Sequence, residues 1–293
     1  MKINNRMKIN DIINKLKNDY HGHYWNERLI DEETTRDKVL YGSTELECTG
    51  IVTTCFCSIY VIEQAHNLNC NLIIAHEGMF YNHGDKTSHL VDNAVFLKKK
   101  KLLDSYGITV WRNHDYIHAG IPLEDGKFVD GIFYGFTEKL GWHSFVNTPY
   151  QITMNYFFKE GIRLLDLAKY ITEKLEIQGV RMIGNENSII HTVRTSMHIL
   201  GNDNQEIQYI EENDIDCLLT MEMVDYTVQE YVRDGYLAGF NKSIISIGHF
   251  NVEEPGMEFF ANCLKRLFKN INIYFVKSQD PFKFVTTHNY MED

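Results

Sequence analysis

Short, fully apolar runs alternate with longer segments that carry apolar residues at helical spacing, and this alternation restricts the fold more than any other feature. In the first half of the chain, strand-length apolar runs begin at Gly50 and cover 71–75 and 108–111. Helical segments at 59–66 and 91–106 separate them. Strands that are apolar on both faces are typical of parallel sheets, and parallel neighbours need crossover connections. The pattern therefore predicts an α/β fold.

The same rhythm returns in the second half of the chain. A strand expected at 150–158 and an amphipathic helix expected at 161–177 lead into it. Further strands and helices then alternate: strands at 180–184, 189–193, 217–220 and 244–247, and helices at 205–212, 224–235 and from Pro255 to Phe268. The two halves can be laid over each other, with 70–77 against 216–222. This spacing indicates either a repeat of one βαβ half or two stretches that merely share the α/β pattern.

Composition excludes several classes of protein. The 293 residues are 44% apolar, and the net charge of −11 comes from mixed acidic and basic residues, so nothing attracts nucleic acid or an anionic membrane. No run reaches membrane-spanning length, and Met1 to Tyr20 lacks the continuous apolar stretch of a signal peptide. The six cysteines lie mostly in apolar stretches without a Cys-x-x-Cys pair, which predicts reduced, buried thiols in a cytoplasmic protein.

Histidine and carboxylate side chains follow the ends of four predicted strands. Because the carboxyl ends of parallel strands meet at one edge of a sheet, side chains placed there can converge on a ligand. Imidazole with carboxylate suits zinc, iron, manganese or cobalt. The residues concerned are His76 and Glu77, His114, Asp115 and His118, Glu222, and His249 with Glu253.

Taken singly, each of these features has an ordinary explanation. His76-Glu77 can be a polar strand terminus, and the His114-x-x-x-His118 spacing arises easily by chance. Their joint placement after apolar strands favours a metal site built from both ends of the sequence, and a bridging Glu would allow two ions. Eight other histidines are expected to be exposed or hydrogen-bonded residues without a ligand role: His21, His23, His66, His89, His143, His191, His198 and His288.

Other catalytic motifs do not occur in the sequence. It contains no Gly-x-x-x-x-Gly-Lys-Ser/Thr phosphate loop, no Gly-x-Gly-x-x-Gly, no Gly-x-Ser-x-Gly and no His-Glu-x-x-His. The histidine and carboxylate groups are therefore the main chemical signal of the chain.

Three segments resemble the Nif-three-like family of dinuclear metal proteins, often catalogued as GTP cyclohydrolase type-two homologues. The segment 72–81 resembles the first signature of that family, which usually runs from an apolar strand into His-His-Pro. The segment 110–118 resembles its middle signature, and 248–253 resembles its last, Gly-His-Tyr-x-x-Glu. The resemblance spans roughly residues 40 to 270, and the three motifs in this order are fairly specific together.

The resemblance implies a set of metal ligands. These are His76, Glu77, His118, His249 and Glu253. The chain departs from the family at two of them, since His-His-Pro has become His-Glu-Gly and the middle aspartate position holds a histidine. Asp115, three residues before His118, is the alternative middle ligand if the loop shifts. One imidazole is exchanged for a carboxylate and one carboxylate for an imidazole, so the ligand character of the whole site is kept.

The resemblance also implies an architecture. It consists of two similar α/β lobes with mixed and parallel sheets that face across a metal-lined cleft, assembled into a homo-hexamer. Residues 1–145 and 241–293 would form a discontinuous first lobe that carries most ligands, and 146–240 would form the second. The return of the C-terminal strand and helix to the first lobe would bring His249 near His76.

These features together predict a dinuclear metal protein with two divalent ions (Zn, Fe, Mn or Co). We expect a metal-dependent, cyclohydrolase-like hydrolase that acts on a small phosphorylated or nucleotide-like substrate through a metal-bound hydroxide. His114, Asp115 and Glu222 are the expected general base or the partners that orient the ligands. Two alternatives stay open: a non-catalytic metal-binding oligomeric scaffold, metal chaperone or regulatory protein, and a metal-free α/β binding protein.

Overall fold

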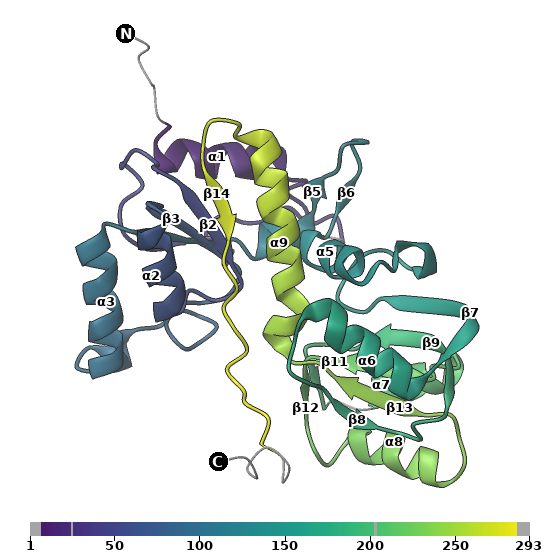
Figure 1. Cartoon of the computed structure of the whole chain (residues 1–293). Helices are drawn as coiled ribbons and strands as arrows, with labels where there is room; N and C mark the ends of the chain where they lie inside the picture. Colours follow the sequence, from purple (N-terminus) through teal and green to yellow (C-terminus); the bar gives the residue numbers. More distant parts are fainter. Residues whose placement is uncertain (1–6, 25, 202–203, 286–293) are drawn as a thin grey trace. The chain divides into compact units, whose positions relative to one another are not determined.

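The chain divides into two compact α/β units. The structure, a computed structural model, describes residues 7–24, 26–201 and 204–285 (Figure 1). His288 and the first six residues of the segment Met1 to Tyr20 lie outside this range. Unit 1 runs to Gly135 and includes Glu254–Ser278, and unit 2 comprises Phe136–Glu253 and the segment from Gln279.

A five-stranded sheet forms the centre of unit 1, with the order β1-β4-β3-β2-β14. Neighbouring strands are parallel except at the β1 edge, where β1 pairs with β4 in antiparallel fashion. All side chains of β2, β3 and β4 are buried, as the apolar runs predict. The strands are β1 (Val39–Tyr41), β2 (Ile51–Thr54), β3 (Leu72–Ala75), β4 (Thr109–Arg112) and β14 (Ile273–Phe275).

Helices cover both faces of this sheet (Figure 1). On one face α2 and α3 enclose a core with Val52, Ile73 and Val110 of the strands. Thr53 points to the opposite face, where its hydroxyl donates to the carbonyl of Met257 in α9 at 3.0 Å. The helices of unit 1 are α1 (Ile9–Asp19), α2 (Ile59–Asn67), α3 (Ala94–Tyr106), α4 (Asp115–Ala119) and the first residues of α5 (Gly131–Leu140), with α9 (His249–Leu267) entering from residue 254. Shorter pieces are η1 (Ser88–Leu90) and the hairpin of β5 (Ile121–Pro122) and β6 (Phe128–Val129).

Unit 2 has its own five-stranded sheet, with the order β7-β9-β11-β13-β8. The three central strands are parallel, and the edge strands β7 and β8 are antiparallel to their neighbours. The strands are β7 (Asn155–Arg163), β8 (Arg181–Ile183), β9 (Ile189–Thr195), β11 (Cys217–Thr220) and β13 (Ser243–Ser246). A short parallel pair, β10 (Ile199–Leu200) and β12 (Glu222–Met223), and the turn η2 (His143–Phe145) complete the unit.

The helices of unit 2 also lie on both faces of its sheet. On one face α7 (Asn204–Glu212) and α8 (Val228–Leu237) pack against Leu218 and Ile244. Tyr156, which is paired with Val193 in the sheet, faces the other way and contacts Trp142, whose ring in turn stacks on Tyr170 of α6 (Leu164–Leu175). Each unit is therefore a sheet between two layers of helix.

The two units repeat one connectivity. In unit 1 the path is β2-α2-β3-α3-β4, with the antiparallel strand β1 beside β4. In unit 2 the path is β9-α7-β11-α8-β13, with the antiparallel strand β8 beside β13. This order agrees with the overlay of 70–77 on 216–222, because β3 and β11 occupy the same central place. The predicted fold class of two similar α/β lobes with mixed sheets is confirmed.

Three stretches expected in the first lobe lie in unit 2 instead. They are 136–145, 241–253 and the segment from 279. Residues 241–253 lie there because β13 hydrogen-bonds with β11 on one side and β8 on the other. His249 and Glu253, which follow β13, consequently lie in unit 2.

Several element boundaries also differ from the sequence prediction. The last helix begins at His249, six residues before Pro255, so this proline lies inside α9. Helix α3 begins at Ala94 and not at 91, because Asn93 caps it by accepting from two backbone amides. Strand β7 continues to Arg163 through its pairing with β9, which delays the start of α6 to Leu164.

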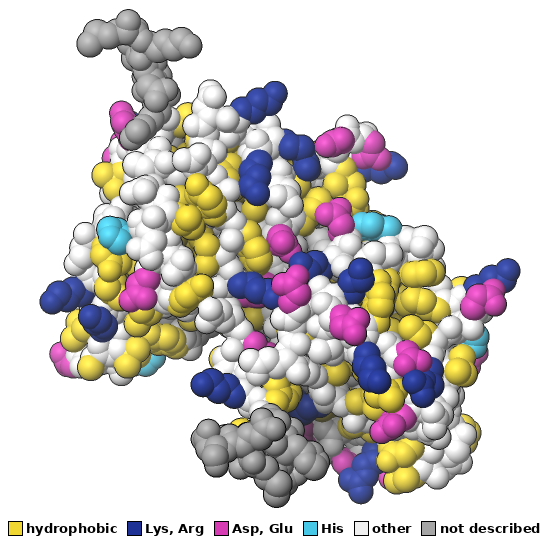
Figure 2. Space-filling view, viewed as in Figure 1, with side chains coloured by type: hydrophobic (Ala, Val, Ile, Leu, Met, Phe, Trp, Pro, Cys, Tyr) yellow, Lys and Arg dark blue, Asp and Glu magenta, His cyan; other side chains and the backbone are white. Residues whose placement is uncertain are grey.

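The surface charge and the cysteines follow the pattern expected from the sequence. On the face drawn in Figure 2, basic and acidic side chains are intermixed. Among the described residues, no helix combines the length and apolarity needed to span a membrane. All six cysteines are free thiols and five of them are buried.

Candidate metal centre

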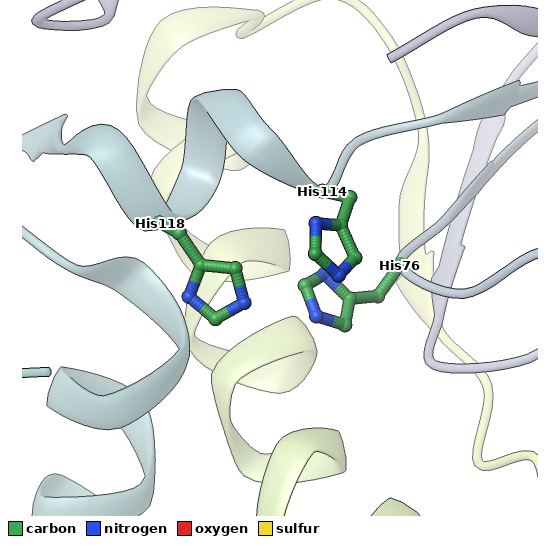
Figure 3. Close-up of side chains that lie close together, drawn as sticks. All are labelled: His76, His114 and His118. Carbon is green, nitrogen blue, oxygen red and sulfur yellow. The ribbon is translucent and has the colours of Figure 1, made fainter. Parts of the chain in front are cut away.

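Three histidines of unit 1 converge on one point (Figure 3). His76 follows β3 directly, while His114 and His118 lie one helical turn apart at the two ends of α4. One ring nitrogen of each lies within 4.8 Å of the others. The rings of His76 and His114 stack with centroids 4.7 Å apart, and His118 meets both nearly edge-on. Two strand ends that are neighbours in the sheet thus deliver all three imidazoles.

Hydrogen bonds at Nδ1 orient the first two of these rings. Nδ1 of His76 lies 3.1 Å from the carbonyl oxygen of Asn113, and Nδ1 of His114 lies 3.0 Å from Oδ1 of Asp115. A carbonyl or carboxylate oxygen can only accept, so each Nδ1 carries the proton and each Nε2 carries the lone pair. This is the arrangement found around histidine ligands of metals.

His118 is held in the same way by Asp130. Its Nδ1 donates to Oδ2 of Asp130 at 2.8 Å. The other oxygen, Oδ1, accepts from the backbone amides of Ile132 and Phe133 at 2.9 and 3.1 Å, which caps the start of α5. One carboxylate therefore couples the orientation of His118 to a helix terminus.

Asp115 is surrounded by donors on both oxygens. Besides His114, it accepts from the hydroxyl groups of Tyr24 and Thr35 at 3.2 and 3.0 Å. It also accepts from the backbone amide and the guanidinium of Arg36. Burial opposes ionisation, but the hydrogen bonds from His114 and Arg36 outweigh it and hold the pKa of Asp115 below its usual range. This geometry makes Asp115 an ionised partner that orients His114.

The pKa of His114 lies well below its ordinary value. Burial is the main cause, and the neighbouring His76 and His118 add to it, while the hydrogen bond to Asp115 acts in the opposite direction. The group therefore holds His114 in its neutral form, which is the form that ligates a metal.

Glu77 lies beside this group and is fixed by a buried arginine. Nη2 of Arg112 donates to Oε2 of Glu77 at 2.9 Å, and Oε1 of Glu77 lies 3.6 Å from Nε2 of His114. The side chain of Arg112 is 1% exposed and also donates to Asp85 and to the carbonyl oxygens of His76 and His83. Arg112 thus holds the loop after β3 in place and turns one oxygen of Glu77 toward His114.

A second group forms in unit 2 from His198, His249 and Glu253, again with ligand atoms within 4.8 Å of one another. Because α9 begins at His249, Glu253 lies one turn further on the same face of the helix. Oε1 of Glu253, which is fully buried, lies 3.1 Å from Nε2 of His249 and 3.5 Å from Nε2 of His198. The two imidazoles stack with centroids 5.2 Å apart.

Glu222, the first residue of β12, orients His249. Its Oε1 lies 2.5 Å from Nδ1 of His249. Burial lowers the pKa of His249, but the hydrogen bonds and charges of Glu222 and Glu253 outweigh it and raise the pKa to about 11. Two carboxylates that stabilise a positive imidazolium also favour a bound cation at the same place.

Both groups fit a divalent metal ion. Within the described part of the chain, Nε2 of His114 and Nε2 of His198 are buried and take part in no hydrogen bond. Buried polar atoms of this kind are rare without a reason such as an ion. Three histidines, and two histidines with one glutamate, are ligand sets of catalytic zinc sites.

The structure thus places the sequence-derived residues in two sets. His76 and His118 lie with His114 in unit 1, and His249 lies with Glu253 in unit 2. That the two sets together form one dinuclear centre stays a prediction.

His198 was expected to have no ligand role, but the structure groups its ring with His249 and Glu253. It lies three residues beyond the end of β9. That strand mixes apolar and polar residues, so the rule of a polar residue after an apolar strand does not identify His198.

The fold and the two groups define a class: an α/β protein of two repeated units with a candidate metal site in each. The family can be stated more closely. The chain belongs to the Duf34/NIF3 (NGG1p interacting factor 3) family, whose sequence profile matches residues 7–281. The resemblance of the three signature segments is thereby confirmed.

Individual relatives are distant in sequence. A Clostridium acetobutylicum protein named GTP cyclohydrolase 1 type 2 homolog is 24% identical over 260 residues, which is 87% of this chain and 92% of the relative. A solved Bacillus cereus protein related to NIF3 superposes with a TM-score of 0.70 at 14% identity, over 95% of this chain and 99% of that chain. Staphylococcus aureus protein SA1388 gives a TM-score of 0.68 at 19% identity, over 95% and 99%. These structures share the fold.

Proposed function

We propose that this protein is a metal-dependent hydrolase that acts on a small phosphorylated or nucleotide-like molecule. One observation carries the proposal: four histidines of the two groups each have Nδ1 within hydrogen-bond distance of an oxygen. The acceptors are Asn113 for His76, Asp115 for His114, Asp130 for His118 and Glu222 for His249. Such partners set the tautomer and orientation of metal ligands.

The proposed ligands are the five derived from the sequence together with two added by geometry. His76, His114 and His118, with Glu77 beside them, would hold one divalent ion, and His198, His249 and Glu253 would hold the other. A single dinuclear centre, a homo-hexamer and a cytoplasmic location are part of the same proposal, and they rest on the family resemblance and the free, buried thiols.

A bound divalent ion would lower the pKa of a water molecule and stabilise negative charge on the substrate. The chain would supply orientation and proton transfer. Asp115 and Asp130 hold two ligands in the tautomer that presents Nε2. Glu222 is the proposed proton acceptor, because Oε1 is engaged by His249 while Oε2 makes no hydrogen bond to any described residue.

The name of the Clostridium acetobutylicum relative, a GTP cyclohydrolase 1 type 2 homolog, supports a nucleotide-like substrate. Pairs of metal ions also suit hydrolytic displacement at phosphorus, which supports a phosphorylated one.

Metal content and turnover test the proposal together. The purified protein, loaded with Mn, Fe or Zn, is assayed on phosphoesters, nucleotides and cyclic amides, and its metal content is measured by elemental analysis. The variants His118→Ala and Glu253→Gln should each lose metal. His66→Ala is the matched control, because the ring of His66 stacks on Tyr106 with centroids 3.9 Å apart and belongs to neither group.

Three outcomes separate the hypotheses. Bound metal with turnover that both variants lose supports the hydrolase. Stoichiometric metal without turnover on any substrate supports the non-catalytic scaffold or metal chaperone instead. Metal content unchanged in Glu253→Gln contradicts the ligand assignment.

A further inference from the structure

A pocket of about 690 Å³ opens beside the His249 group in unit 2. His249 and Glu222 form part of its wall, together with the ends of β11 and β13 and the first residues of α9. The segment 280–284 also lines it. Its volume lies in the range of small-molecule sites. A ligand in this pocket would touch both the orienting carboxylate and a proposed metal ligand.

Most of the wall is apolar and much of it is aromatic or thioether. Met221 and Met223 come from the strand ends, Phe250 from α9, and Phe282 and Phe284 from the C-terminal segment. Aromatic rings and methionine sulfur make favourable contacts with flat rings. The wall therefore suits a ligand that carries a flat ring.

Two cations stand among these apolar side chains. Arg181 begins β8, and Lys283 belongs to the C-terminal segment. The guanidinium of Arg181 reaches Ser246 only at 3.5 Å. Asp280, three positions before Lys283 in the sequence, accepts hydrogen bonds from other groups. These are the side-chain amide of Asn251 at 3.3 Å and the backbone amide of Phe282 at 2.9 Å. Asp280 thus links the C-terminal segment to α9. Arg181 and Lys283 can then interact with an anionic ligand.

We infer that this pocket is the substrate pocket of the His249 group, and that it takes a molecule in which a flat apolar ring is joined to a phosphate-like anion. In this arrangement Phe284 would contact the ring, and Arg181 and Lys283 would lie near the anion. The start of α9 adds backbone amides of the kind that bind anions. This inference rests on the proposed function and specifies its substrate class.

A matched set of probes tests it on the full-length, metal-loaded protein. 1-Naphthylphosphonate combines ring and anion and resists hydrolysis, 1-naphthol supplies the ring alone, and methylphosphonate supplies the anion alone. Titration calorimetry should show 1-naphthylphosphonate binding at least about tenfold more tightly than either fragment, since each half contributes contacts. Equal binding of 1-naphthylphosphonate and methylphosphonate would overturn the inference.

Variants locate the binding. Arg181→Ala and Phe284→Ala should each weaken 1-naphthylphosphonate about tenfold, because a hydrogen bond to a charged group and an aromatic contact are each worth this much. Arg163→Ala is the control, since Arg163 is an exposed arginine of the same unit that pairs with Asp166 at 2.7 Å. Undiminished binding in both pocket variants would overturn the assignment of the pocket.

Metal analysis of the same samples separates this inference from the proposed function. Probe binding that depends on Arg181 and Phe284, in protein that holds no metal, would support the pocket and refute the hydrolase. Metal that is lost in Glu253→Gln, with no specific probe binding in the wild type, would support the metal sites and refute the pocket.

Discussion

The carboxylate of Asp130 serves two local structures at once. Oδ1 accepts the first amides of α5, and Oδ2 accepts from His118. Substituting the acid by its amide separates these functions, because an asparagine oxygen can still cap the helix while its amino group cannot accept from Nδ1. The consequence is a specific effect on metal affinity.

For Asp130→Asn we expect a loss of about 10- to 100-fold in metal affinity, the usual effect of removing a partner of a histidine ligand. Competition with a chromophoric chelator measures it. Thermal unfolding of the metal-free variant serves as the control and should match wild type, because the cap is kept. Unchanged affinity would show that His118 does not depend on Asp130.

Arg112 is a buried cation whose loss should destabilise unit 1. Its side chain is 1% exposed and lies between Glu77 and Asp85 at 2.9 and 3.2 Å. Arg112→Met would leave two carboxylates without their buried cation, and we expect destabilisation on the order of 3–5 kcal/mol. Urea unfolding measures the change.

Arg163→Met is the matched control for this experiment. Arg163 pairs with Asp166 at 2.7 Å, but both side chains are largely exposed. We expect less than about 1 kcal/mol, as for exposed ion pairs generally. If both variants lost similar amounts of unfolding free energy, the burial of Arg112 would not add to its contribution to stability.

Helices α5 and α9 pack closely because each has a glycine at their contact. A Cβ on Gly256 would lie 2.4 Å from the Cα of Ile132, and one on Gly135 would lie 2.6 Å from the Cα of Gly256. These neighbours are backbone atoms, which cannot move aside as a side-chain tip can. The close approach therefore requires glycine on both helices.

Gly256→Ala should destabilise the protein by about 1–3 kcal/mol through overpacking, despite the better helix propensity of alanine. Gly84→Ala is the control, because its nearest atoms would lie 3.8 Å or more away. Differential scanning fluorimetry compares the two. A stabilised Gly256→Ala would show that the helices can separate without cost.

The same helix shows where sequence reasoning falls short. Proline fits the first turn of a helix, so Pro255 predicts a helix start there. The structure instead continues α9 back to His249 and accepts the lost amide hydrogen bond inside the helix. Local propensity cannot reveal this extension, which places His249 and Glu253 on one face. The apolar runs that became β3, β4, β11 and β13 were predictable, because buried parallel strands have no polar face to confuse the pattern.

The sequence predicted two lobes, with boundaries after residues 145 and 240, whereas the structure divides after Gly135 and Glu253. The segment 244–247 carries no mark that assigns it to one sheet or the other, since strand pairing is a long-range choice. The five expected ligands were named through the family resemblance and their positions after strands, and they are His76, Glu77, His118, His249 and Glu253. His198 was missed because a lone histidine after a strand has no spacing partner in the sequence.

If each of the two groups binds its own ion, each should contribute a separate part of the metal-dependent stability. A ligand that binds only the folded state stabilises it by about 2.7 kcal/mol when present at 100 times its dissociation constant. We therefore expect EDTA to lower the thermal unfolding midpoint of the metal-loaded protein. His118→Ala and His198→Ala should each remove one part of this shift and one metal equivalent, and the double variant should be insensitive to EDTA. His66→Ala, the control, should keep the full shift, and a wild-type protein whose midpoint ignores EDTA would contradict both groups as metal sites.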